Sequence, residues 1–303
     1  MRAPALLNKP EYLCRPTQIL SKIRFLIRSQ RSDHLLPVSL PWGDVIRASA
    51  TDAIGKSLLT LGVHELAVSE VLWRLVDRGD VCLDIGANIG YMTSLLSIRT
   101  GSAGRVFSFE PHPRLFACLK RNLESFSNGS RIVAEENAIG AADGMAELAE
   151  PVGFEKNAGT ASVLPSVVGS DFAGVKQKVA MRRLDSIFLN DESFGVVKID
   201  VEGAELDVFR GAKRLLTTKR IRDVVWEDHN VFPSESAKLL LKNGYKIYQF
   251  SKKIFGLAIW DPFRSQAKRA DAPWETVNFL ATYEPARAVT RLSPRGWQCL
   301  QCA

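Results

Sequence analysis

Residues 81–90 read VCLDIGANIG, and this stretch decides the fold. Apolar residues recur at helical spacing over 66–78 before it and again over 91–98 after it. The run Val81–Ile85 is short and apolar, as a buried strand is, and Gly86–Gly90 has the composition of a tight turn. We therefore predict a strand, a turn and a helix in immediate succession.

The same alternation continues along the chain. Further strands are predicted at residues 105–110, 131–138, 194–200, 224–227, 246–250 and 276–283, and helices at 113–126, around 206–209 and at 236–241. Strands that alternate with helices form βαβ units, so we predict an α/β, Rossmann-like fold with a mostly parallel sheet and helices on both faces. The stretch 141–183 interrupts this rhythm, and we expect it to form an inserted hairpin or loop near the open edge of the site.

Composition and charge narrow the class of protein. The chain of 303 residues has a net charge of +7 and a mean hydropathy near zero, which is typical of a soluble globular protein. No apolar stretch approaches the roughly 18 residues of a membrane span, and the N-terminus lacks the pattern of a secretory signal. We therefore expect a cytoplasmic protein without a transmembrane segment.

The ends of the chain differ from its centre. Basic residues gather in the first 50 positions, so we predict a basic leader or cap over 1–60, a main domain over 61–285 and a tail over 286–303. Such a leader either attracts a phosphate-rich partner or an anionic membrane surface, or is a solvated segment. In the tail, Cys299 and Cys302 have CxxC spacing, but zinc needs about four ligands and no second pair follows, so we predict no metal site.

The first turn lacks the pattern that a dinucleotide requires. A G-x-G-x-x-G loop brings backbone amides to a pyrophosphate, whereas Asn88 and Tyr91 stand where its second and third glycines would be. Asp84 would also repel a pyrophosphate. S-adenosyl-L-methionine carries an ammonium and a sulfonium but no phosphate, so we predict that Asp84 binds its cationic end while Gly86 and Gly90 let the backbone approach the ligand. The alternative is a plain strand-to-helix turn.

Two more polar residues follow neighbouring strands. Glu110 ends the strand after the turn, where an acid can accept both ribose hydroxyls of S-adenosylmethionine, although it would do the same for NAD. Asn137 ends the next predicted strand, and we expect it to lie over the adenine; a turn-forming role is the alternative.

The run KIDVEG at residues 198–203 places charges in a central strand. Lys198 and Asp200 point to one face of that strand, and charged groups there are costly unless they pair or face the site. We predict Asp200 as a catalytic residue and Lys198 and Glu202 as residues that bind the acceptor; the alternative is a Lys–Asp pair followed by helix capping. His229, after the strand at 224–227, is a candidate general base or a surface histidine.

With these motifs together, the chain resembles the FkbM-type methyltransferases, a branch of the class I methyltransferases. The matching residues, between about 42 and 250, are Trp42-Gly43, Gly62, Glu65, Asp84–Gly90, Glu110-Pro111, Asn137–Gly140, Leu184-Asp185, Lys198–Glu205 and Gly211-Ala212. The resemblance implies a seven-stranded sheet, S-adenosylmethionine as methyl donor with Glu65 among the residues that bind it, and O-methylation of a hydroxyl on a sugar, glycan or natural product.

The alternatives to O-methylation are a silent scaffold, NAD-linked oxidoreduction and methylation of RNA. A catalytically silent scaffold of the same fold would have no need for Asp84 and Glu110 together. NAD-linked oxidoreduction is disfavoured by the missing glycines. Methylation of RNA stays open because of the net charge of +7, whereas binding to DNA is not expected. We therefore expect a methyltransferase whose partner is a small-molecule or glycan hydroxyl acceptor, in an oligomeric state that is left open.

Overall fold

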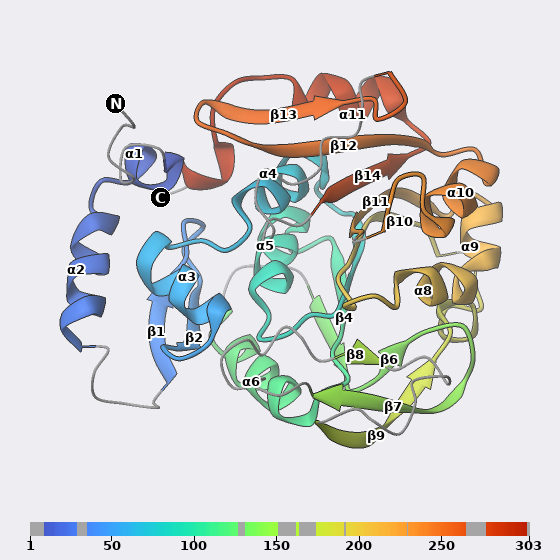
Figure 1. The fold of residues 1–303 in the computed structure, drawn as a ribbon, viewed down its shortest axis with the longest axis horizontal. Coiled ribbons are helices and arrows are strands. Elements are labelled where there is room, and N and C mark those ends of the chain that lie inside the picture. Colours follow the sequence, from blue (N-terminus) through green and yellow to red (C-terminus); the bar gives the residue numbers. More distant parts are fainter. Residues whose placement is uncertain are drawn as a thin grey trace.

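An eight-stranded sheet lies at the centre of the protein (Figure 1). The structure is a computed structural model that describes residues 9–28, 35–126, 131–150, 162–163, 174–190, 192–228, 230–264 and 277–301. In spatial order the strands are β13 (Gly256–Trp260), β12 (Lys246–Lys253), β14 (Asn278–Thr282), β11 (Ile221–Glu227), β10 (Phe194–Ile199), β3 (Val81–Ile85), β4 (Arg105–Phe109) and β5 (Arg131–Glu135). Strands β11 to β5 run parallel and the other three pair antiparallel, which confirms the predicted α/β fold class.

Strand order reverses between β3 and β10. The chain moves outward from β3 through β4 to β5, then returns to β10 and moves outward in the other direction. In open α/β sheets, ligands bind outside the carboxyl ends of the strands at such a reversal. The turn at 86–90 and the loop after Ile199 both begin at this place.

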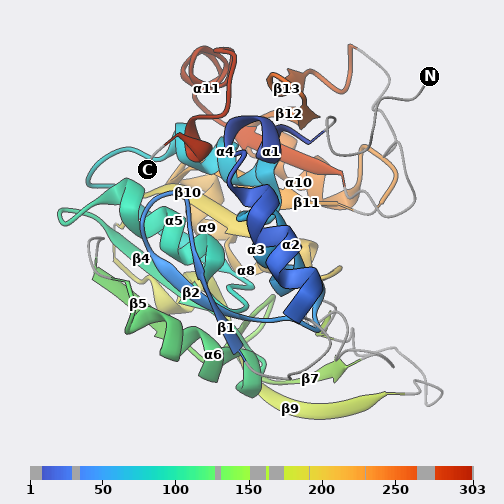
Figure 2. The same cartoon turned by 90° about the vertical axis from the view of Figure 1, so that its left-hand side faces the viewer.

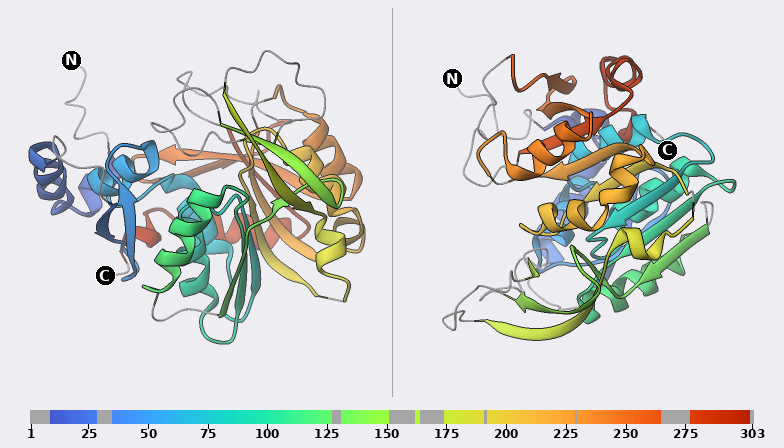
Figure 3. Two further views of the ribbon diagram at one scale, coloured as in Figure 1. Left: turned by 90° about the horizontal axis from the view of Figure 1, so that it is seen from below. Right: turned by 90° about the vertical axis from the view of Figure 1, so that its right-hand side faces the viewer.

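Helices cover both faces of the sheet (Figures 1 and 3). One face carries α4 (Leu66–Leu75), α5 (Tyr91–Thr100) and α11 (Pro285–Leu292), and the other carries α7 (Leu184–Ile187), α8 (Glu205–Gly211), α9 (Lys213–Thr217) and α10 (Glu235–Lys242). Strand residues alternate between the two cores: Cys82 and Val196 pack in the first, and Leu83 and Val197 in the second. This is the period of two that buries a strand on both faces.

The N-terminal segment shares the first of these cores. Its elements are α1 (Pro10–Cys14), α2 (Gln18–Arg28), β1 (Leu35–Ser39), β2 (Val45–Ser49) and α3 (Ala53–Leu61). Trp42 is buried, and its Nε1 donates to Ser94 Oγ at 2.7 Å; that hydroxyl in turn donates to Asp44 at 2.6 Å. The part from residue 35 onward therefore packs on the sheet domain, unlike a solvated leader.

The C-terminal segment is held to α4 by a buried ion pair. Glu70 and Arg74 lie 2.6 Å apart, and the Glu70 carboxylate accepts hydrogen bonds from the backbone N of Gln298 and of Cys299. These two residues begin the 3-10 helix η3 (Gln298–Leu300), and Cys299 is buried. The segment predicted as a bare tail thus contributes to the core as far as Leu300, while Cys302 lies outside the described residues. One core crosses both predicted boundaries, near 60 and 286.

A smaller sheet lies beside the first, in the order β6 (Ala138–Ile139), β9 (Val175–Arg182), β7 (Gly144–Glu150) and β8 (Ser162–Val163). Strands β7 and β9 pair antiparallel within the stretch predicted as an insertion. Beyond β5, α6 (Pro113–Leu123) packs against both β5 and β2.

Two sequence-based expectations about strands were wrong. The single strand predicted at 131–138 ends at Glu135, because Ala138 pairs with Met181 in the smaller sheet instead of continuing the larger one. The seven-stranded sheet gains an eighth strand, because residues 256–260 fold back on β12 as a hairpin and extend the antiparallel edge.

Candidate active site

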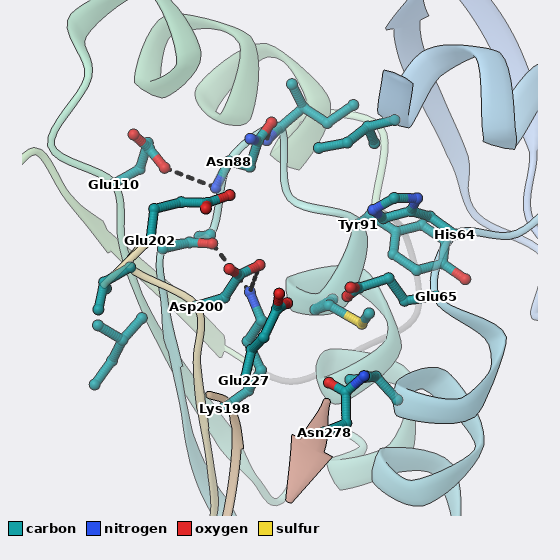
Figure 4. A pocket seen from close by; sticks show the side chains of 18 of the residues that line it. His64, Glu65, Asn88, Tyr91, Glu110, Lys198, Asp200, Glu202, Glu227 and Asn278 are labelled. Atoms are coloured by element: carbon teal, nitrogen blue, oxygen red, sulfur yellow. Dashed lines mark hydrogen bonds and ion pairs between the residues drawn. The ribbon is translucent and has the colours of Figure 1, made fainter. Parts of the chain in front are cut away.

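A pocket of about 840 Å³ opens at the carboxyl ends of β3, β4 and β10. Its volume falls within the range of about 300–1,000 Å³ that is usual for small-ligand sites. Figure 4 shows Asn88, Glu110 and Glu202 on one side of the pocket and His64, Glu65 and Tyr91 on the other, with Lys198 and Asp200 between them. The pocket therefore joins the turn after β3 to the loop after β10.

The turn after β3 depends on Gly86. Its φ is +77°, and a Cβ at this position would lie 1.8 Å from the backbone oxygen of Asp200. Glycine alone tolerates both constraints. Asn88 also has a positive φ, of +50°, which asparagine adopts more readily than most residues. Gly90, at +93°, ends the turn and begins α5.

Glu110 is fastened by backbone groups at the edge of this turn. One carboxylate oxygen accepts from the backbone N of Asn88 at 2.8 Å and the other from that of His112 at 2.9 Å. Burial raises the pKa of Glu110 to about 7, and these two hydrogen bonds oppose the shift. The carboxyl lines the pocket, as predicted for a residue that meets the ribose.

Asp84 lies beneath the turn and not in the pocket wall. Its side chain is fully buried, accepts a hydrogen bond from Thr93 Oγ1 at 2.6 Å and lies 3.6 Å from Lys198 Nζ. Burial raises the pKa of this carboxyl, and the charge of Lys198 opposes the shift. The predicted direct bond from Asp84 to a donor ammonium does not fit this geometry, because the carboxylate is out of reach of the pocket.

Lys198 connects the two loops. Its Nζ lies 3.3 Å from Asp200 Oδ2 and donates to the backbone oxygen of Gly86 at 3.1 Å. Burial opposes the lysine charge, but the carboxylates of Asp200, Asp84 and Glu65 outweigh it and raise the pKa of Lys198. The lysine is therefore a charged side chain at the base of the pocket, and the carboxylates of Asp84 and Asp200 and the Gly86 carbonyl hold it in place.

Two more carboxyls face Asp200 across the pocket. Glu65 stands immediately before α4 with a φ of +44°, and Glu202 follows β10 with a φ of +51°. Burial, followed by the charge of Asp200, raises the pKa of each to about 7. Both carboxyls are thus poised to gain or lose a proton near neutral pH.

A known protein family has a sequence similar to that of this chain. The sequence model of the Methyltransferase FkbM domain matches residues 84–247, more than half of the chain, from the end of β3 through β4, β10 and β11. The chain belongs to the FkbM methyltransferase family. It is accordingly an S-adenosylmethionine-dependent methyltransferase, as the motifs after β3 and β10 predicted.

Individual relatives of this FkbM methyltransferase are distant. The hexuronic acid methyltransferase AglP of Haloferax volcanii is 28% identical over 177 residues, which cover 58% of this chain and 67% of AglP. An S-adenosylmethionine-dependent O-methyltransferase from Thermotoga maritima has a TM-score of 0.42 at 13% identity and covers 82% of this chain and 77% of that one. Fibrillarin from Aeropyrum pernix, bound to S-adenosyl-L-methionine, has a TM-score of 0.38 at 15% identity and covers 83% and 96%.

The pocket of this FkbM methyltransferase fits the charge of its donor. Six carboxyl-bearing residues line it against two lysines. A ligand with a sulfonium and an ammonium gains from such an excess of negative charge. Below the turn, Asp84 Oδ1 lies 3.6 Å from Lys198 Nζ, so the charge of this carboxyl is balanced by the lysine.

The role of Asn137 at the adenine stays a prediction. Its side chain lines the pocket beside Ala138 and Ile139 and donates to Glu135 at 2.9 Å. His229, the predicted general base, lies outside the described residues.

Sequence reasoning missed several residues of the pocket wall. His64 is half-buried, and desolvation of its ring lowers its pKa to about 4, so its imidazole is neutral beside the ring of Tyr91. Asn278 reaches the site because β14 runs antiparallel, which sets its first residue opposite Glu227 at the end of β11. Only Glu227 carried a sequence signal, since it ends a parallel strand; His64 and Asn278 carried none.

Two further properties of the described residues concern metal ions and membranes. No group of three or more His, Cys, Asp or Glu side chains in this part of the chain is arranged to hold a metal ion. Within the same ranges, no helix has the length and apolar composition that crossing a membrane requires.

Proposed function

We propose that this FkbM methyltransferase transfers a methyl group from S-adenosylmethionine to a hydroxyl of a sugar or glycan. The observation that carries the proposal is the cluster of carboxyls around Asp200, immediately beside the donor turn. Carboxylates are suited both to hydrogen-bonding the several hydroxyls of a sugar and to accepting a proton from one of them.

We assign the donor to the side of the pocket formed by the turn after β3. Glu110 would accept the ribose hydroxyls, Asn137 would lie against the adenine, and Gly86, Asn88 and Gly90 would let the backbone approach the ligand. Glu65, across the pocket, would hold the cationic amino-acid end. Asp84 acts as a positioning residue, because it contacts Lys198 and Thr93 below the turn.

The acceptor side belongs to the loop after β10. When bound, S-adenosylmethionine supplies an electrophilic methyl group. Asp200 would accept the proton of the acceptor hydroxyl, while Lys198 holds the carboxylate in place at 3.3 Å. Glu202 would bind neighbouring hydroxyls. His229 follows β11 in the sequence and remains our second candidate for the base.

The identity of one relative supports a sugar as acceptor. AglP is by name a hexuronic acid methyltransferase, and its match to this chain spans 177 residues. A sugar acceptor also suits a pocket whose wall carries alternating carboxyl and amide groups, with Glu227 and Asn278 beside Asp200.

The test combines an acceptor panel with a variant. Purified protein is mixed with S-adenosylmethionine and, in turn, hexuronic acids, neutral hexoses, oligosaccharides and RNA, and the release of S-adenosylhomocysteine is measured. We expect release with a sugar. Asp200→Asn should lower kcat by about 10²–10⁴-fold, the usual contribution of a general base, and leave donor affinity within about three-fold.

Asp207→Asn is the matched control, since Asp207 is an exposed residue of α8 paired with Arg210. It should leave kcat unchanged. Full activity in Asp200→Asn would refute the assignment of the base. Donor binding with no release on any acceptor would favour a silent scaffold, and release with RNA alone would replace the sugar by a nucleic acid.

A further inference from the structure

Helix α2 lies at the outside of the protein (Figure 2), and three of its apolar side chains are exposed. Ile19, Leu20 and Ile23 have 36%, 56% and 48% of their surface exposed. Positions separated by one, three and four residues lie on one side of a helix. The other side is represented by Gln18, which is buried against Gly62 at the end of α3. The exposed side therefore has no partner among the described residues of this chain.

A second apolar projection lies nearby, at the turn between β12 and β13. Phe255 is 76% exposed and Ile254 is 38% exposed. The strand that leads to this turn is joined to α1, because Lys252 Nζ lies 3.0 Å from Glu11 Oε1. Helix α1 in turn contacts α2, where Lys22 Nζ lies 5.5 Å from the centre of the Tyr12 ring. The two apolar projections thus belong to neighbouring parts of the surface.

The charge around both projections is positive. Among the side chains that the structure describes between residues 9 and 28, the basic ones are Lys9, Arg15 and Lys22. The only acid in that range, Glu11, is buried and paired with Lys252. Lys253, on the hairpin, adds a further exposed cation.

We propose that α2 and the β12–β13 turn together bind the surface of an anionic lipid bilayer. A helix of 11 residues is about 16 Å long and can lie in the plane of the interface, with its apolar side chains among the acyl chains and its cations at the headgroups. A nucleic acid would use the cations but would gain nothing from isoleucine and leucine side chains. The combination therefore favours a membrane over RNA.

The position of this surface relative to the pocket is informative. Glu11 and Lys252, the pair that joins α1 to the hairpin, also line the pocket. The wall of the pocket therefore extends to the pair that joins α1 to the hairpin, so the pocket would lie close to an acceptor carried in the same bilayer. The binding itself does not depend on the proposed sugar acceptor and is measured without donor or acceptor.

The test is flotation of the full chain with lipid vesicles. Vesicles of phosphatidylcholine are compared with vesicles of phosphatidylcholine and phosphatidylglycerol in equal parts. We expect binding to the anionic vesicles, weakened by added salt, and little binding to the neutral ones. The double variant Leu20→Glu with Ile23→Glu should reduce partitioning at least about ten-fold, because two side chains that would enter the bilayer become charged. Phe255→Ser should reduce it less.

Leu189→Glu is the matched control, because Leu189 is 76% exposed after α7, a helix that packs on α8 and α9 away from α2. It should bind vesicles as the unaltered protein does. An unchanged melting temperature in the double variant shows that its fold is retained. The proposal is overturned if the unaltered protein does not float with anionic vesicles, if the double variant floats equally well, or if RNA binds this face in their place.

Discussion

The two sides of the pocket are held together in different ways. On the donor side, backbone groups close in sequence do the work: the amides of Asn88 and His112 fasten Glu110, and all three lie within 25 residues of one another. On the proposed acceptor side, the contacts join distant segments, because Lys198 in β10 meets both Asp84 at the end of β3 and Asp200 in the loop after β10. The first region is a local structure, and the second is an electrostatic balance made by tertiary folding.

This difference predicts which changes each region tolerates. A local turn is sensitive to backbone conformation and close approach, as at Gly86. A group of buried ion pairs is sensitive to the removal of either the cation or the anion. The charge that remains then has no partner inside the protein, which destabilises the fold. The following experiments separate the two regions.

The largest effect is expected from Lys198→Met. It leaves Asp84 and Asp200 without their shared cation, so the free energy of unfolding should fall by about 3–5 kcal/mol. Denaturant unfolding measures this change. The control Lys246→Met removes a more exposed pair with Asp261 and should cost less than about 1 kcal/mol. Equal losses in both variants would contradict a charge balance at the acceptor side.

Gly86→Ala should damage the donor side instead. The added Cβ would meet the backbone oxygen of Asp200 at 1.8 Å, so we expect donor affinity to fall at least about ten-fold by calorimetry, along with a loss of stability. Gly79 is the control: it lies before β3, has a φ of +85° and nothing near its added Cβ. Gly79→Ala should cost only about 1–2 kcal/mol of left-handed strain and leave donor affinity intact. Undiminished affinity in Gly86→Ala would place the donor elsewhere.

The pH dependence of donor binding tests Glu65. A carboxyl with a pKa near 7 is about one-tenth ionised at pH 6 and three-quarters ionised at pH 7.5, so affinity should rise about eight-fold between them. Stability has the opposite sign: the raised pKa stabilises the folded state below pH 4.5, and this contribution is lost as the pH rises to about 7. Calorimetry across this range should show the step in affinity.

Glu65→Gln should reduce that step, and the part that remains belongs to Glu110, whose pKa is also raised to about 7. Glu202→Gln is its matched control, because Glu202 has a similarly raised pKa but is assigned to the acceptor. The step should therefore persist there. If it disappears in Glu202→Gln and survives in Glu65→Gln, the two assignments must be exchanged.

The smallest effect is expected from Asn137→Ala. It removes one polar side chain from the donor side, and a single hydrogen bond contributes about 0.5–1.5 kcal/mol, or a few-fold in donor affinity. Asn243→Ala, in a surface loop after α10, is the control and should leave the affinity unchanged. No difference between the two variants would mean that Asn137 serves only the turn between β5 and β6.

Prediction from sequence succeeded where structure is local. The strands at Val81–Ile85 and Arg105–Phe109 and the helices that follow them have a periodicity that nearby residues set. Prediction from sequence failed where pairing between distant strands determines the structure. Residues 136–139 continue the β pattern of β5, yet they leave the large sheet because Ala138 finds Met181 as partner. The hairpin strand β13 and the buried residues Cys299 and Leu300 depend in the same way on surfaces that only the folded protein provides.

For the candidate site as well, the features set by local motifs were predicted and those set by tertiary contacts were not. The sequence by itself determined the family and the turn after β3, and it placed Glu110 and Asn137 after parallel strands, because these follow from contiguous motifs. Only the tertiary structure decided that Asp84 lies below the pocket, that Glu65 faces Asp200 and that Asn278 joins the wall from an antiparallel strand. Charge interactions between distant segments depend on distance and burial, and neither quantity exists until the chain has folded.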